Sequence, residues 1–213
     1  MKKLFKYDGL FYRFMNKFGN LIILNLLFLL TSIPLITIVS SLSALYYATV
    51  KTVRTENGYP MREYWEAFKR EIKKGLLMGT ALVVSAVVLY IDLLYVSQSP
   101  SLFGALSYAV FILLAIICFG LLIYYPIVLS RFKLKTMELL KLSLFMLFKH
   151  LPSTILLFII YIAAGLLILL IPIPLAFIVP SIMLFFTSFI TEKIFKNYMS
   201  VDENEDPKWY FEL

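Results

Sequence analysis

The sequence predicts an all-α, polytopic bundle of transmembrane helices. Its 213 residues are 61% hydrophobic and have a mean hydropathy of +0.87, whereas soluble domains are about 45–50% apolar. A chain of this size cannot hide so much apolar surface in its own core, so the excess must face lipid. Apolar runs recur along the whole length, which predicts a single integral membrane domain over residues 1–213.

Four of these runs are plain spanning segments. A transmembrane helix needs about 20 mostly apolar residues, because it rises 1.5 Å per residue through a hydrocarbon layer about 30 Å thick. The runs cover residues 75–96, 102–129, 153–171 and 175–190, and Asp92 is the one charged residue in them.

The first apolar block, residues 21–50, is long for a single crossing. As one helix it would also place the basic N-terminal segment and the basic stretch 51–74 on opposite sides of the membrane, against the positive-inside tendency. A break at Pro34 removes both difficulties, since proline suits the first turn of a new helix. We therefore expect six transmembrane helices in three hairpins with both termini cytoplasmic. The alternative is five helices with the N-terminus outside.

A basic amphipathic segment precedes each expected hairpin, at residues 11–18, 61–73 and 134–149. Apolar residues recur there at spacings of three and four, which marks one face of a helix. Such helices lie in the membrane interface, so we expect them to form cytoplasmic elbows. Residues 1–20 are then an interfacial N-terminal segment, and residues 191–213 form a cytoplasmic tail.

The net charge of +7 does not predict nucleic-acid binding, because the basic residues lie beside spanning segments. Cytoplasmic flanks of membrane helices collect Lys and Arg, and the anionic inner leaflet attracts them. Membrane lipids are therefore the expected partners. The tyrosine pairs at residues 46–47 and 124–125 lie near predicted span ends, as in an interfacial aromatic belt.

The residues that could carry chemistry are few. His150 and Cys118 are the one histidine and the one cysteine, too few for a transition-metal site. The sequence contains no Gly-rich phosphate loop, and the apolar spans hold no paired carboxylates for acid–base work. We expect no catalytic residues, no metal and no cofactor.

Small residues at helical spacing predict close helix contacts instead. Such residues let two backbones approach, either within one chain or between subunits. The candidates are the stripe Ser40, Ala44 and Ala48 and the pair Gly75 and Gly79.

Two polar residues in the apolar runs are further candidates. Asn25 is expected to hydrogen-bond across helices, a contribution of about 1 kcal/mol in membranes. Intramembrane charge is costly, which makes Asp92 a possible polar site for a proton, an ion or a substrate. Because Asp92 precedes the end of its run by about one turn, it could instead be an interfacial anchor.

A set of motifs extends along nearly the whole chain: residues 25–37 (NLLFLLTSIPLIT), Ser41, and residues 44–47, 68–69, 125–126, 131–132 and 149–152. Their order resembles the pattern of the YesL-like family of bacterial membrane proteins. Val39 departs from the family pattern, which often has glycine there. Members are typically encoded with carbohydrate ABC importers and glycoside-degrading enzymes of Gram-positive bacteria. The resemblance therefore implies an association with sugar uptake at the bacterial cell membrane, and it brings no catalytic residues.

These observations lead to one expected function and two alternatives. The expected function is a non-catalytic accessory subunit of a carbohydrate ABC importer, which binds the permease within the membrane through the small-residue stripes. The first alternative is a stand-alone transporter or channel, with Asn25 and Asp92 along its pathway. The second is a membrane sensor or scaffold whose output is the acidic tail.

Overall fold

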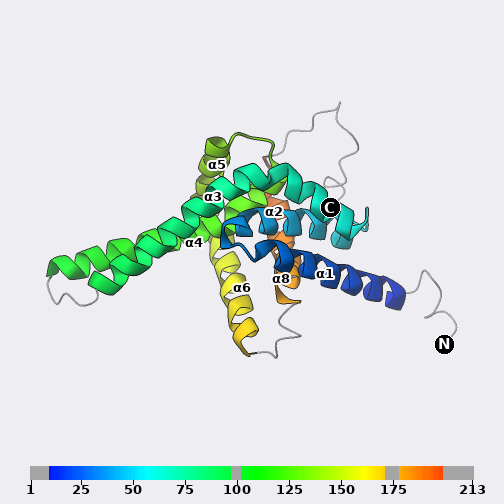
Figure 1. Cartoon of the computed structure of the whole chain (residues 1–213), viewed down its shortest axis with the longest axis horizontal. Coiled ribbons are helices and arrows are strands. Elements are labelled where there is room, and N and C mark those ends of the chain that lie inside the picture. The colour runs from blue at the N-terminus through cyan, green and yellow to red at the C-terminus, as the bar shows by residue number, and fades with distance from the viewer. Residues whose placement is uncertain (1–9, 97–101, 171–177, 199–213) are drawn as a thin grey trace.

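The computed structural model describes residues 10–96, 102–170 and 178–198, and this part of the chain is helical without strands (Figure 1). The elements are α1 (Leu10–Ser32), the 3-10 helix η1 (Leu35–Thr37), α2 (Ile38–Ala48), the π-helix η2 (Thr49–Arg54), α3 (Pro60–Val96), α4 (Leu102–Arg131), α5 (Thr136–Lys149), α6 (Leu151–Leu170) and α8 (Val179–Phe195).

Five described segments are long and apolar enough to cross a membrane. They are Met15–Ser32, Leu35–Arg54, Pro60–Val96, Phe103–Arg131 and Leu151–Leu170, as expected of a membrane protein. The beginning of the expected span 175–190 lies outside the described residues, and α8 has 17 residues.

Residues 21–50 form two helices rather than one, and the break lies at Pro34. Helix α1 ends at Ser32, and the short η1 begins at Leu35. The Thr37 side chain donates hydrogen bonds to the carbonyl oxygens of Thr31 (2.5 Å) and Pro34 (2.6 Å). The bond to Thr31 satisfies one of the last carbonyls of α1, which have no partner within the helix.

Two of the three expected elbows are not separate elements. Residues 61–73 continue without a break into the apolar run, so that α3 is one helix of 37 residues. Likewise, α1 runs from Leu10 through the first apolar segment. In the second elbow Tyr64, Ala67 and Phe68 are buried against the protein, whereas Met61 is 57% exposed and Trp65 and Ile72 are partly exposed. Only α5 is a separate amphipathic helix.

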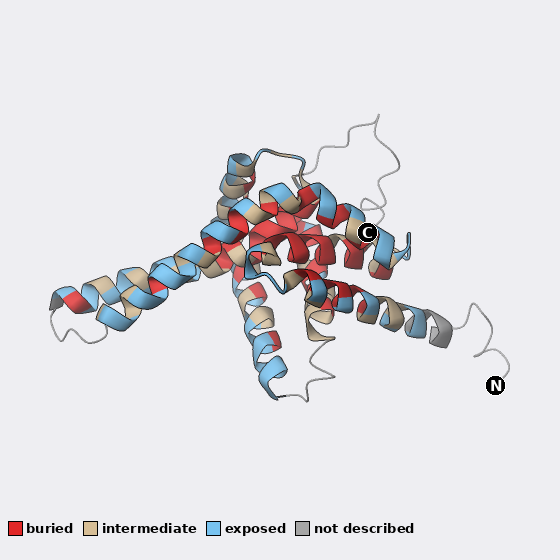
Figure 2. Ribbon diagram, viewed as in Figure 1, coloured by how far each residue is buried: buried red, intermediate tan, exposed pale blue. Residues whose placement is uncertain are grey.

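Helix α2 forms the centre of the molecule. Its residues are almost all buried, and it contacts α1, α3, α4 and α8. Figure 2 shows this buried region where the helices meet, while α3 and α4 continue beyond it as a two-helix arm of mostly exposed or partly exposed residues. Helices α6 and α8 leave the core in a different direction from that arm (Figure 1).

Candidate functional site

A buried charged cluster joins α2, α4 and α8. Arg131, the last residue of α4, directs Nε and Nη2 to Oε1 of Glu192 in α8, at 2.8 and 2.6 Å. The Tyr46 hydroxyl of α2 donates to the same oxygen at 2.7 Å. The side chains of Arg131 and Glu192 are only 2% and 3% exposed. We call these three residues the charged cluster.

Further polar contacts extend the cluster along α8. The Tyr46 hydroxyl also lies 2.7 Å from Oγ1 of Thr191. The Arg54 guanidinium of η2 donates to the Ser188 carbonyl at 2.9 Å and stacks over the Phe189 ring at 4.5 Å from its centroid. Each of these charged side chains contacts a group on another helix, so the arrangement links α2, η2, α4 and α8.

The small residues named from the sequence lie inside the protein. Ser40, Ala44 and Ala48 are fully buried in α2. A Cβ atom at Gly75 would collide with Ser40, and one at Gly79 with the Ile36 backbone. Gly75 and Gly79 therefore make the close contact of α3 with Ser40 and Ile36. All five small residues are buried in this conformation, and none is exposed to a second subunit.

The two candidate polar residues lie apart. Asn25 is buried in α1, and its amide makes no hydrogen bond to a described protein group, so the expected bond across helices is absent. Asp92 is partly exposed near the end of α3, on the arm beyond the core. The structure therefore does not combine Asn25 and Asp92 in one site.

The expected aromatic belt is wrong for three of the four tyrosines. Tyr46, Tyr124 and Tyr125 are fully buried. Tyr46 belongs to the charged cluster, and the Tyr124 hydroxyl lies 2.9 Å from Oγ1 of Thr154 in α6. The hydroxyl of Tyr46 therefore connects α2 to α8, and that of Tyr124 connects α4 to α6. Neither tyrosine faces lipid, because these parts of α2 and α4 pack within the core.

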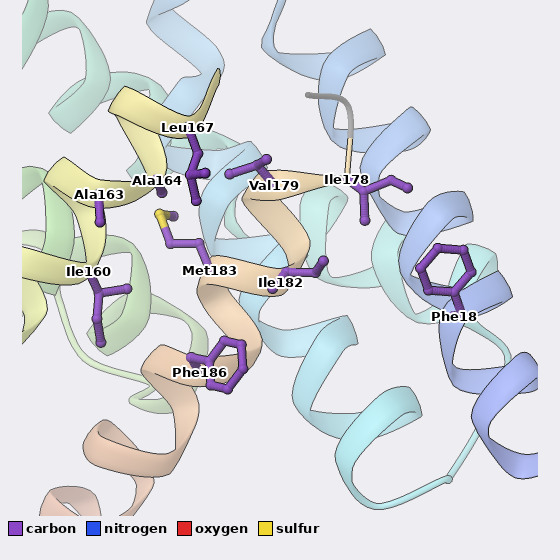
Figure 3. A pocket seen from close by; sticks show the side chains of 10 residues that line it. All are labelled: Phe18, Ile160, Ala163, Ala164, Leu167, Ile178, Val179, Ile182, Met183 and Phe186. Atoms are coloured by element: carbon purple, nitrogen blue, oxygen red, sulfur yellow. The ribbon is translucent and has the colours of Figure 1, made fainter. Parts of the chain in front are cut away.

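An open apolar groove of about 610 Å³ lies between α1, α6 and α8 (Figure 3). Its lining is Phe18, Ile160, Ala163, Ala164, Leu167, Ile178, Val179, Ile182, Met183 and Phe186. The small side chains of Ala163 and Ala164 form part of one wall of the groove. A Cβ atom added at the adjacent Gly165 would have no neighbouring heavy atom within 4 Å. A second apolar cavity, of about 510 Å³, lies among α2, α3 and α4 and includes Cys118.

Sequence reasoning missed Glu192, because residues 191–213 were expected to form a tail. Helix α8 extends into this segment as far as Phe195, and Thr191, Glu192 and Phe195 are buried. The available signal was the position of Glu192 just after the apolar run 175–190. A carboxylate so close to the hydrocarbon layer usually requires a charged or hydrogen-bonding partner. The acidic stretch of the expected tail lies outside the described residues.

The remaining described residues add no metal-binding group. Among residues 10–96, 102–170 and 178–198, no three His, Cys, Asp or Glu side chains gather where they could hold an ion. His150 directly follows α5, and its Nε2 lies 2.9 Å from the hydroxyl of Tyr198, which lies just beyond α8. It therefore links the segments that follow these two helices.

Comparison with known proteins gives one match. No curated protein and no solved structure matches the chain. A family model described as "Protein of unknown function, DUF624" matches residues 21–93, which include the Pro34 break and the Gly75–Gly79 contact. The first part of the chain is thus similar to DUF624, the family to which YesL-like proteins belong.

Proposed function

We propose that this protein is a non-catalytic accessory subunit of a carbohydrate ABC importer and binds the permease within the membrane. The observation that carries the proposal is the apolar groove between α1, α6 and α8. Its alanines allow a helix of another protein to approach closely, and van der Waals contact of this kind drives helix association in lipid. The groove replaces the buried Ser40 stripe as the contact surface.

The pairing of the charged residues favours binding over transport. Arg131 is paired with Glu192, and Lys51 Nζ lies 2.7 Å from Glu63 Oε2. Both cavities described above are lined mainly by apolar side chains. A pathway for sugars or ions requires polar groups that face an opening. The charged groups in these pairs contact each other instead.

The class of partner rests on the resemblance to YesL-like proteins, which are typically encoded with carbohydrate ABC importers. Such an association does not define a mechanism, so the binding surface needs a direct test. Ala163 lines the groove and is exposed, which makes Ala163→Trp a variant that fills the groove without entering the core. Ala109 is an exposed alanine on α4 outside both cavities, and Ala109→Trp is its control.

The experiment is mild affinity purification from native membranes, with mass spectrometry of the recovered proteins. We expect permease subunits with the wild-type protein and with Ala109→Trp, and at least several-fold less permease with Ala163→Trp. Absence of the permease from the wild-type sample, together with unchanged sugar uptake after deletion, would refute the proposal. Solute flux through the purified protein alone would favour the transporter alternative.

A further inference from the structure

Helix α5 has apolar residues on two opposite faces. Leu139, Met146 and Leu147 are buried in the core. Met137, Phe145 and Phe148 lie on the other side and are 69%, 46% and 55% exposed. Burying apolar surface is favourable at roughly 25 cal/mol per Å², so this second face has a clear tendency to be covered.

Lysines accompany this exposed apolar face. They are Lys133, Lys135, Lys141 and Lys149, all exposed. Glu138 is the single acid between residues 133 and 149, and its carboxylate accepts a hydrogen bond from the Lys135 backbone N–H at 3.0 Å. Lys149 Nζ lies 4.9 Å from the centroid of the Phe145 ring. Cationic and aromatic groups therefore share one surface.

The position of α5 indicates what covers this surface. The helix lies between the end of α4 and the beginning of α6, and both neighbours contain candidate membrane spans. Figure 1 shows α5 on the opposite side of the core from the far end of α6. A short helix between two spanning helices lies at the membrane boundary. Lysines beside exposed aromatic residues are typical of helices that lie in the lipid interface.

We propose that the exposed face of α5 is a binding surface for anionic glycerophospholipids. Met137, Phe145 and Phe148 enter the boundary between headgroups and acyl chains, while Lys135 and Lys141 contact the phosphate groups. The charge complementarity between these lysines and an anionic leaflet favours lipid over a protein partner. This inference is independent of the importer proposal, since it concerns a different surface.

The test measures which lipid lies next to α5 in the full-length protein. Phe148→Trp is introduced with Trp65→Phe and Trp209→Phe, so that the new tryptophan is the only one. The protein is reconstituted in bilayers with brominated phosphatidylglycerol or brominated phosphatidylcholine, and quenching gives the relative affinity of the two lipids. We expect a preference for phosphatidylglycerol that falls by about 30-fold in Lys135→Gln/Lys141→Gln, because each of the two lysines contributes on the order of 1 kcal/mol near an anionic surface.

Two controls separate a local site from a general charge effect. Lys69→Gln/Lys73→Gln removes the same charge from exposed positions of α3 and should leave the preference at Phe148→Trp unchanged. Leu169 on α6 is 82% exposed, and a tryptophan there should be quenched equally by both lipids. Equal quenching at Phe148→Trp, or no quenching by either lipid, would overturn the proposal. The latter result would indicate that water or a protein partner covers α5.

Discussion

Arg131 and Glu192 form an ion pair in which Nη2 and Oε1 are 2.6 Å apart and both side chains are almost completely buried. The pair joins the end of α4 to the last turns of α8. Taking two charges out of water is costly, and only close pairing with additional hydrogen bonds offsets that cost. Tyr46 supplies such a bond from α2, so the three helices depend on one another.

Removing one member of the pair should destabilise the protein strongly. Glu192→Ala leaves the Arg131 guanidinium buried without its partner, and we expect a loss of about 3–5 kcal/mol in the free energy of unfolding. Denaturant unfolding in detergent micelles measures it. Glu66→Ala breaks the exposed pair with Arg62 and should cost less than about 1 kcal/mol. Equal effects of the two variants would contradict the buried pairing.

The hydroxyl of Tyr46 should contribute separately. Tyr46→Phe keeps the ring but removes the hydrogen bond to Glu192, and bonds to charged groups contribute about 1.5–3 kcal/mol. The same unfolding measurement should show a loss of that size. Tyr59 is 78% exposed, and Tyr59→Phe is expected to behave as the wild type. If Tyr46→Phe had the same denaturant midpoint as the wild type, the Tyr46 hydroxyl would not stabilise the cluster.

Glycine should be required at residue 75 but not at residue 165. Gly75→Ala places a methyl group against Ser40, which separates α3 from α2 and should lower the unfolding free energy by about 1–3 kcal/mol. Gly165→Ala enters open space and should be neutral or stabilising by up to about 1 kcal/mol through helix propensity. Thermal unfolding in micelles distinguishes them. The reverse order of stabilities would refute the contact between α2 and α3.

Cysteine labelling should distinguish six spans from five. Lys3→Cys, Asn57→Cys and Ser99→Cys are made separately with Cys118→Ser, which removes the one native cysteine. We expect a membrane-impermeant maleimide to label residue 99 in intact cells and to reach residues 3 and 57 only after permeabilisation. Labelling of residue 3 in intact cells, with residue 57 still protected, would instead support five spans.

The break at Pro34 and the locations of the long apolar helices could be predicted from the sequence. Proline lacks the backbone N–H that a continuous helix needs, and uninterrupted apolar runs require lipid or core. The continuity of α3 could not be predicted in the same way. An amphipathic pattern is equally compatible with a lipid interface and with a protein surface, and part of the apolar face of α3 is buried within the protein, where α1 and α2 both contact this helix.

For the small-residue stripe, too, the sequence predicted part of the result and the tertiary structure decided the rest. Its spacing predicted close helix contact, and Gly75 lies directly against Ser40. Whether that contact joins helices of one chain or of two depends on how the helices are arranged. The burial of Ser40 in α2 assigns this side chain to contacts within the chain, whereas the groove between α1, α6 and α8 is open.

The sequence by itself determined that this is a helical membrane protein, because hydropathy and proline act locally along the chain. The tertiary structure alone decided that Arg131, Glu192 and Tyr46 meet. These residues are far apart in the sequence, and the local pattern around each one does not identify its partners. Packing of the three helices removes these side chains from water together. A buried charge without a partner is very costly, so the Arg131–Glu192 pair and the hydrogen bond from Tyr46 become favourable only in the folded structure.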